Sequence, residues 1–169
     1  MEEHLKQEYT EIIKIAFVGP ESTGKTTLAA QLAEEFNTNW IPEFARDYLQ
    51  DKWDLKQEIC SEVDLMPIAI GQTQLENEAL KNANKILFCD TNVLVTKVFS
   101  DIYYNSCDAL IANAANKHKY DLIFLTDVDV PWKKDDLRDN PNDRKKSMAV
   151  FEQALIEYKK PYIKLSGNK

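Results

Sequence analysis

Residues 19–26 are the feature that most constrains the fold. They run Gly-Pro-Glu-Ser-Thr-Gly-Lys-Thr and fit the pattern G-x-x-x-x-G-K-[ST] at every fixed position. Residues 12–18, just before them, are β-branched, apolar and aromatic, which predicts a buried strand. After them, Leu28, Leu32 and Phe36 recur every four residues, as in a helix. The sequence therefore predicts a strand, a glycine-containing loop and a helix in direct succession.

The residue types of this loop suit a nucleoside triphosphate. Gly19 and Gly24 allow tight turns and a close approach of the backbone to phosphate. Successive backbone N–H groups and the start of the helix attract an anion. Lys25 supplies a cation for the β- and γ-phosphates, and the Thr26 hydroxyl can hold Mg²⁺. The alternative is a chance match on a glycine turn, but the flanking strand and helix argue against it.

Guanine-specific switches share such a loop and usually carry an N-K-x-D segment as well. Residues 84–87 and 116–119 begin with Asn-Lys but lack the final Asp. A guanine switch is therefore disfavoured, whereas the preference of a kinase between ATP and GTP is not set by these residues.

Strands and helices alternate along the rest of the chain. We expect further strands at 40–41, 85–89, 120–126 and 162–165, and helices over 43–50, 68–82, 92–104, 109–117 and 148–158, with 51–61 unassigned. This alternation predicts an α/β fold with a parallel sheet. The 169 residues fit a single domain, since domains usually have about 100–200 residues. Ligands of such sheets bind beyond the carboxyl ends of the strands.

Acidic residues follow two of the predicted strands. Asp90 ends the run Phe-Cys-Asp, where a carboxylate can hold Mg²⁺ or orient an attacking hydroxyl. Its structural alternative is to cap the helix that starts near Asn92. Glu43 could bind and deprotonate an acceptor hydroxyl, and Arg46, on the same helical face, could hold substrate or phosphate. The alternative for this pair is an exposed ion pair of little energetic value.

A charged segment at about 127–146 is a candidate lid. Residues 133–146 contain six Lys or Arg and four Asp, although the whole chain carries a net charge of −7. Phosphoryl transfer needs cations around the migrating group, often on a segment that closes over it. Arg138 and Arg144 are the candidates for this role. The alternative is a solvated charged surface.

The composition excludes other classes of protein. The negative net charge argues against a general nucleic-acid binder. No apolar run approaches the roughly 20 residues that span a bilayer, so we expect no membrane association. Residues 1–11 hold no apolar signal region, which predicts a cytoplasmic protein. His4 and His118 stand in polar contexts that look exposed, and we assign them no chemistry.

Taken together, these motifs resemble the ribosylnicotinamide kinase domain of a bacterial NAD-salvage protein that often fuses this kinase to an adenylyltransferase. The likeness spans about residues 12–167. The similar segments are Gly19–Thr27, Phe36-Asn37-Thr38 with Pro42–Tyr48, Asp64 with Ile68-Ala69-Ile70-Gly71-Gln72, Phe88–Thr91 with Thr96, and Asp129-Val130-Pro131-Trp132 with Asp135, Leu137 and Arg138. The resemblance implies a P-loop kinase fold with five parallel strands flanked by helices and with a mobile lid.

The resemblance also implies an activity and a set of site residues. ATP and Mg²⁺ would serve a kinase that phosphorylates the ribose 5′-hydroxyl of nicotinamide riboside to give nicotinamide mononucleotide. The triphosphate would contact Gly19, Glu21, Ser22, Thr23, Gly24, Lys25, Thr26 and Thr27, together with the lid cations Arg138 and Arg144. The metal would lie at Thr26 and Asp90, and the acceptor at Glu43, Arg46, Asp64, Trp132 and Asp135. Lys25, Glu43, Asp90 and Arg138 would act in catalysis.

This sequence departs from the family pattern at two positions. Leu65 stands where an aromatic residue is expected, and Asp136 stands where the lid usually has Gly. No fused adenylyltransferase is expected, so coupling of the two steps would need a separate protein. Two alternatives stay open: a kinase for another small nucleoside-like substrate, and an ATP-binding regulatory module without an acceptor.

Overall fold

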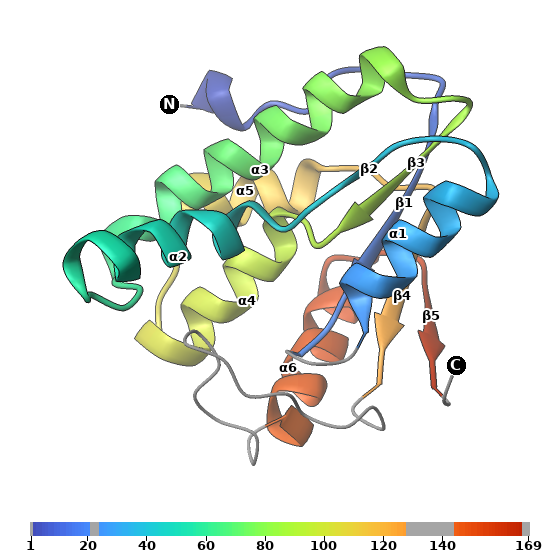
Figure 1. The fold of residues 1–169 in the computed structure, drawn as a ribbon. Helices are drawn as coiled ribbons and strands as arrows, with labels where there is room; N and C mark the ends of the chain where they lie inside the picture. The colour runs from blue at the N-terminus through green and yellow to red at the C-terminus, as the bar shows by residue number, and fades with distance from the viewer. Residues whose placement is uncertain (1, 21–23, 128–143, 167–169) are drawn as a thin grey trace.

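Five parallel strands form a single sheet at the centre of the computed structural model, which describes residues 2–20, 24–127 and 144–166 (Figure 1). The strands are β1 (Ile13–Val18), β2 (Trp40–Ile41), β3 (Ile86–Asp90), β4 (Leu122–Thr126) and β5 (Tyr162–Leu165). Their order across the sheet is β2-β3-β1-β4-β5. The expected five-stranded parallel sheet is confirmed. Because the chain leaves β1 and β3 toward opposite edges, these two central strands form the switch point where ligands bind in such folds.

The helices connect the strands in chain order. They are α1 (Lys25–Glu35), α2 (Phe44–Lys56), α3 (Leu65–Ala79), α4 (Val93–Tyr104), α5 (Ala109–Lys117) and α6 (Arg144–Glu157), and short 3₁₀ turns lie at Glu2–Leu5, Glu62–Asp64 and Leu80–Asn82. None of the helices in the described part of the chain has the length and apolar character needed to span a bilayer.

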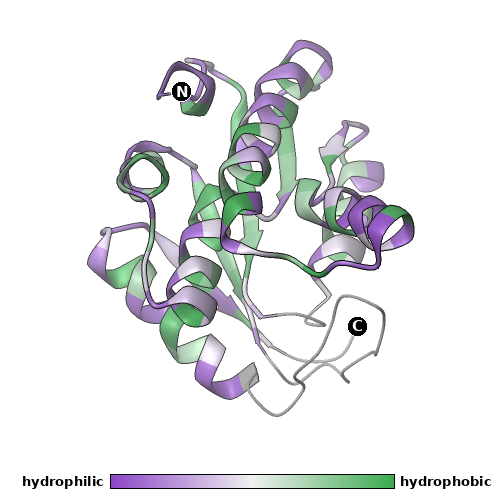
Figure 2. Ribbon diagram, turned by 90° about the vertical axis from the view of Figure 1, so that its left-hand side faces the viewer, coloured by the Kyte–Doolittle hydropathy of each residue, from purple (hydrophilic) through white to green (hydrophobic). Residues whose placement is uncertain are grey.

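Alternating side chains of the strands build two separate apolar layers. On one face, Phe17 and Phe88 pack with Ala29 and Ala33 of α1. On the other, Ala16 and its neighbours on the same side of the sheet pack against α3, α4, α5 and α6. Figure 2 shows the apolar strands inside and hydrophilic surfaces on the surrounding helices. The sheet is thus covered on both faces, and its carboxyl edge is left to carry the site.

Several element boundaries differ from those expected. The unassigned stretch contains the second half of α2, which ends where Gln57 adopts a left-handed conformation (φ 54°). The next helix starts at Leu65, earlier than expected, because Pro67 fits a first helical turn. In α1 the helical spacing is confirmed. Small alanines face the sheet, whereas Phe36 at the end of the helix is 53% exposed.

A buried polar cluster ties the N-terminal segment to the opposite, amino-terminal edge of the sheet. Lys14 and Glu76 form an ion pair at 3.3 Å, and both side chains are buried. The Glu76 carboxylate also accepts hydrogen bonds from the Tyr120 hydroxyl at 2.6 Å and from the Gln7 amide at 2.7 Å. Removing one member would leave the others buried without their partner.

His118 belongs to the same region, and its expected exposure is wrong. Its side chain is buried, and Nε2 lies 2.7 Å from the carbonyl oxygen of Leu5. Burial lowers the pKa of the imidazole, so the neutral ring, with Nε2–H donating to Leu5, fits this environment. The polar sequence around His118 gives no sign that the N-terminal segment folds over it.

Replacing Glu76 with Gln should strongly destabilise the fold. The Lys14 ammonium would stay buried without a carboxylate, and breaking a buried pair costs about 3–5 kcal/mol. The matched control is Glu78→Gln, on the same helix, where the pair with Lys81 is exposed and its loss should change stability little. Urea unfolding of the two variants measures the difference. Equal losses of stability would contradict a structural role for the buried cluster.

Candidate active site

The phosphate loop begins at the end of β1, at the carboxyl edge of the sheet. Gly19 has a φ of +145°, and Gly24, which caps α1, has a φ of +88°. A Cβ atom on Gly19 would lie 2.6 Å from Thr126 Oγ1 and 2.8 Å from the Thr126 carbonyl oxygen. Glycine is therefore required at position 19 for space as well as for conformation. Glu21, Ser22 and Thr23 lie outside the described residues.

Lys25 lies buried at the start of α1. Its Nζ donates hydrogen bonds to the carbonyl oxygens of Gly19 at 3.0 Å and Pro20 at 2.9 Å. No carboxylate of the described residues pairs with it. Two neutral carbonyls orient the ammonium group without neutralising its charge, so an anion bound in the loop would be favoured. This arrangement suits a phosphate ligand.

Asp90 reaches the phosphate loop from the neighbouring strand. In the pairing of β1 with β3, Asp90 lies opposite Phe17, and the Thr26 hydroxyl donates a hydrogen bond to Asp90 Oδ2. The capping alternative for Asp90 is wrong, because Asn92 caps α4 by accepting from the Val95 amide at 3.2 Å. A hydroxyl and a carboxylate side by side are the hard oxygen donors that Mg²⁺ prefers. The donor set therefore fits the metal expected there.

Thr91 is strained at the end of β3. It has a φ of +80°, which is an outlier for a β-branched residue. Its amide donates to the carbonyl of Phe17 at 2.9 Å. Its hydroxyl is buried and has no hydrogen-bond partner among the residues that the structure describes. Strain of this kind persists at sites where the surroundings fix the backbone, here directly after Asp90.

Glu43 lies between β2 and α2, on the same edge of the sheet. Ile41 pairs with Cys89, so the chain just after β2 runs level with Asp90 and Thr91 on the adjacent strand. Neighbouring strands are about 4.8 Å apart, which brings Glu43 to the region of Asp90. Arg46 is in the first turn of α2, and its amide donates to the Glu43 carbonyl at 3.1 Å. The structure thus brings Lys25, Thr26, Asp90 and Glu43 to one edge.

The Asp64 carboxylate accepts hydrogen bonds from three neighbouring residues of the chain. Its Oδ2 accepts from Lys52 Nζ at 2.6 Å and from the Ser61 amide at 2.8 Å, and its Oδ1 accepts from the Tyr48 hydroxyl at 3.1 Å. Burial raises the pKa of this carboxyl, but the hydrogen bonds, led by that from Lys52, outweigh burial and lower it. Asp64 therefore joins α2 to the start of α3, and its contact with an acceptor stays a prediction.

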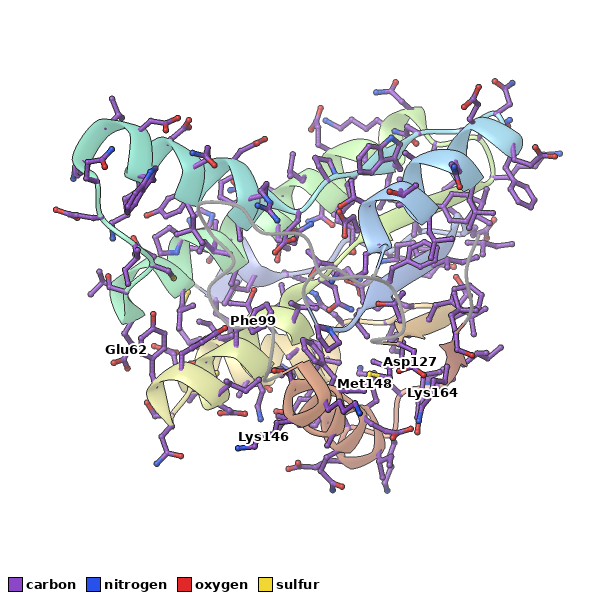
Figure 3. The ribbon with its side chains drawn as sticks, turned by 60° about the horizontal axis from the view of Figure 1, so that its bottom comes forward. Glu62, Phe99, Asp127, Lys146, Met148 and Lys164 are labelled. Carbon is purple, nitrogen blue, oxygen red and sulfur yellow. The ribbon has the colours of Figure 1, made fainter. Side chains whose placement is uncertain are left out.

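The candidate lid falls mostly outside the described residues. Trp132, Asp135 and Arg138 lie there, whereas Arg144 is the first residue of α6. Figure 3 brings the carboxyl edge forward and labels Asp127, directly after β4, and Met148 on α6. The Asp127 amide donates to the Leu165 carbonyl at 2.9 Å, which joins the ends of β4 and β5.

Gln72 also contacts the candidate site, although the sequence patterns assign it no role. This residue of α3 is buried and hydrogen-bonded to the chain on both sides of Glu43. It lies within the Ile68–Gln72 segment that carried the family resemblance, and that segment was the only signal pointing to it.

The fold and this edge define a P-loop nucleotide-binding protein with the architecture of a nucleoside kinase. The first strand, β1, leads into a phosphate loop. The Asp90 carboxylate of β3, which lies beside β1 in the sheet, contacts Thr26. The chain belongs to the AAA_28 family, described as an AAA domain, whose match covers residues 14–169.

Two curated relatives are 32% identical over 145 residues. Both are the trifunctional NAD biosynthesis/regulator protein NadR, from Salmonella typhimurium and from Escherichia coli. The match covers 85% of this chain and 34% of each relative, so the chain spans about a third of their length. This likeness confirms the resemblance to the NAD-salvage family.

Solved structures confirm the expected P-loop kinase fold. A NadR protein in complex with NR superposes with a TM-score of 0.80 at 22% identity, over 94% of this chain and 44% of that one. A deoxyadenosine kinase from M. mycoides superposes with a TM-score of 0.65 at 12% identity, over 91% and 90% of the two chains.

Gly19→Ala should abolish binding of an ATP analogue, because the new methyl group would overlap the backbone of Thr126 and displace the loop. The matched variant is Gly24→Ala. The added methyl group at position 24 would meet no atom of the described residues within 4 Å, and the substitution costs the left-handed backbone strain, about 1–2 kcal/mol. Calorimetric titration of both variants compares the dissociation constants. Wild-type binding by Gly19→Ala would contradict the close packing of the loop on β4.

Proposed function

We propose that the chain is an ATP-dependent kinase that phosphorylates the ribose 5′-hydroxyl of nicotinamide riboside and releases nicotinamide mononucleotide. The observation that carries the proposal is the contact between Thr26 and Asp90, because it joins a phosphate loop to a strand-end carboxylate beside Glu43. The 32% identity to NadR proteins and the fold of a NadR protein in complex with NR support this choice of acceptor. The chain would act in the cytoplasm, and a separate adenylyltransferase would consume its product.

One group of residues would bind the triphosphate and Mg²⁺. The ammonium of Lys25 would neutralise phosphate oxygens, with Glu21, Ser22, Thr23 and Thr27 completing the loop. Thr26 and Asp90 would hold Mg²⁺, which supplies charge neutralisation to the phosphates when bound. Arg138 and Arg144 would add cations from the lid side.

On the acceptor side, Glu43 or Asp90 would accept the hydrogen bond of the 5′-hydroxyl. Arg46, Asp64, Trp132 and Asp135 would contact the nucleoside. Positioning and charge dominate this chemistry, so the carboxylate need not take the proton fully before transfer.

Another small nucleoside is the second candidate for the acceptor. Leu65 is buried in the core, so this position supplies no aromatic clamp for a pyridine ring. The superposition with deoxyadenosine kinase also covers nearly the whole of both chains. An ATP-binding regulatory module, in contrast, would show no acceptor-dependent turnover.

The test of the proposal is ADP release with ATP, Mg²⁺ and a panel of nucleosides, with products identified by mass. We expect release that depends on nicotinamide riboside, and a loss of at least about 100-fold in Lys25→Ala, because a charge-stabilising donor is removed. The exposed Lys81→Ala is the matched control and should match the wild type. Release with a different nucleoside only would overturn the acceptor, and normal turnover by Lys25→Ala would overturn the mechanism.

A second comparison separates the two carboxylates. If Asp90 holds the metal, Asp90→Asn should raise the Mg²⁺ concentration needed for half-maximal rate. If Glu43 binds the acceptor hydroxyl, Glu43→Gln should lower kcat by about 10²–10⁴ without changing that concentration. Steady-state rates across a Mg²⁺ titration measure both effects. An unchanged Mg²⁺ requirement in Asp90→Asn would remove Asp90 from the metal site.

A further inference from the structure

The side-chain amide of Gln72 bridges the two peptide units that flank Glu43. Its Oε1 accepts from the backbone amide of Phe44 at 2.8 Å, and its Nε2 donates to the carbonyl of Pro42 at 3.2 Å. The first bond fixes the peptide that follows Glu43, and the second fixes the peptide that precedes it. Two fixed peptide planes determine the φ and ψ angles between them, and so the direction of the Glu43 Cα–Cβ bond.

The same contact gives the first amide of α2 an acceptor. Phe44 is the first residue of this helix, and its amide is one of the four that have no partner within the helix. A cap residue normally supplies an acceptor for these early amides, but the Glu43 side chain makes no such bond. Gln72 of α3 supplies an acceptor instead. Glu43 therefore occupies the cap position without its carboxylate being used as the cap.

The bridge is rigid because its surroundings are tightly packed. The Gln72 side chain is only 3% exposed. The preceding residue is Gly71, where a Cβ atom would lie 2.3 Å from the ring of Phe44. Only glycine at position 71 lets the start of α2 come this close to α3 without moving that ring. The sequence Gly71-Gln72 thus holds the start of α2 by packing and by hydrogen bonding.

We propose that Gln72 is a positioning residue of the acceptor site, which aims Glu43 at the acceptor hydroxyl by holding the backbone on both sides of it. This rests on the proposed function, because it assigns to Gln72 a role in nucleoside phosphorylation. The role is indirect: Gln72 acts through Glu43. Loss of the bridge should therefore impair use of the nucleoside and leave the phosphate loop, on the other side of β3, unaffected.

The test compares Gln72→Met, which keeps the length of the side chain and loses both hydrogen bonds, with Thr73→Val. Thr73 is the next residue of α3 and is equally buried, and its hydroxyl donates to the Ala69 carbonyl of its own helix. Hydrogen exchange at the Phe44 amide should be about tenfold faster in Gln72→Met, because this amide loses its acceptor. In Thr73→Val it should match the wild type. Gln72→Glu, which keeps an acceptor, should restore part of the protection.

Kinetics then separate positioning from a purely structural role. We expect Gln72→Met to lower kcat/KM for the nucleoside about tenfold or more, with the dissociation constant of an ATP analogue unchanged and a melting temperature close to that of Thr73→Val. Nucleoside kinetics equal to those of Thr73→Val would overturn the positioning role, as would unchanged exchange at Phe44. If the wild type phosphorylates no nucleoside, the proposed function itself fails. That outcome differs from failure of the positioning role, because nucleoside phosphorylation is then absent in the wild type as well as in Gln72→Met.

Discussion

The hydrogen bond from Thr26 to Asp90 joins the two halves of the candidate site. Thr26 belongs to the helix that starts at the phosphate loop, and Asp90 ends the neighbouring strand, so the bond links β1 and β3 at the switch point of the sheet. Both groups offer oxygen atoms, and Asp90 is almost fully buried. A metal bound by these oxygens would therefore lie between the nucleotide and whatever binds over β3 and β2. With the strand order β2-β3-β1, the proposed acceptor side, over β2 and β3, would lie next to the phosphate loop at the end of β1.

Helices cover both faces of the sheet beside this edge. Ala29 and Ala33 let α1 approach the strands on one face, and α3 to α6 fill the other. The loop itself is pressed against the end of β4 through Gly19. On the side of β2 and α2, the contacts of Asp64 and Gln72 join α2 to α3. They fix the start of α2, where Glu43 and Arg46 lie. Packing of Gly19 on β4 thus fixes the phosphate loop, and buried hydrogen bonds fix the start of α2. Preorganised sites require such fixed backbone positions.

The parts of this site that could be predicted are those set by local sequence. The strand before the loop, the helix after it and the strand ending at Asp90 follow from short patterns, and all three form where they are expected. Contacts between distant segments could not be predicted in this way. His118 is buried by an N-terminal segment more than 100 residues away, and Gln72 bonds across 28 residues to Phe44. Each depends on which helices lie side by side, and single-sequence patterns do not carry that information.

A crystal structure with a non-hydrolysable ATP analogue, Mg²⁺ and nicotinamide riboside would test whether nucleotide, metal and acceptor meet at this edge of the sheet. We expect the metal to be bound by Thr26 and Asp90, and the ribose 5′-hydroxyl to lie within hydrogen-bond distance of Glu43 or Asp90. A metal held by other residues, or a nucleoside bound away from the carboxyl ends of β2 and β3, would contradict this expectation.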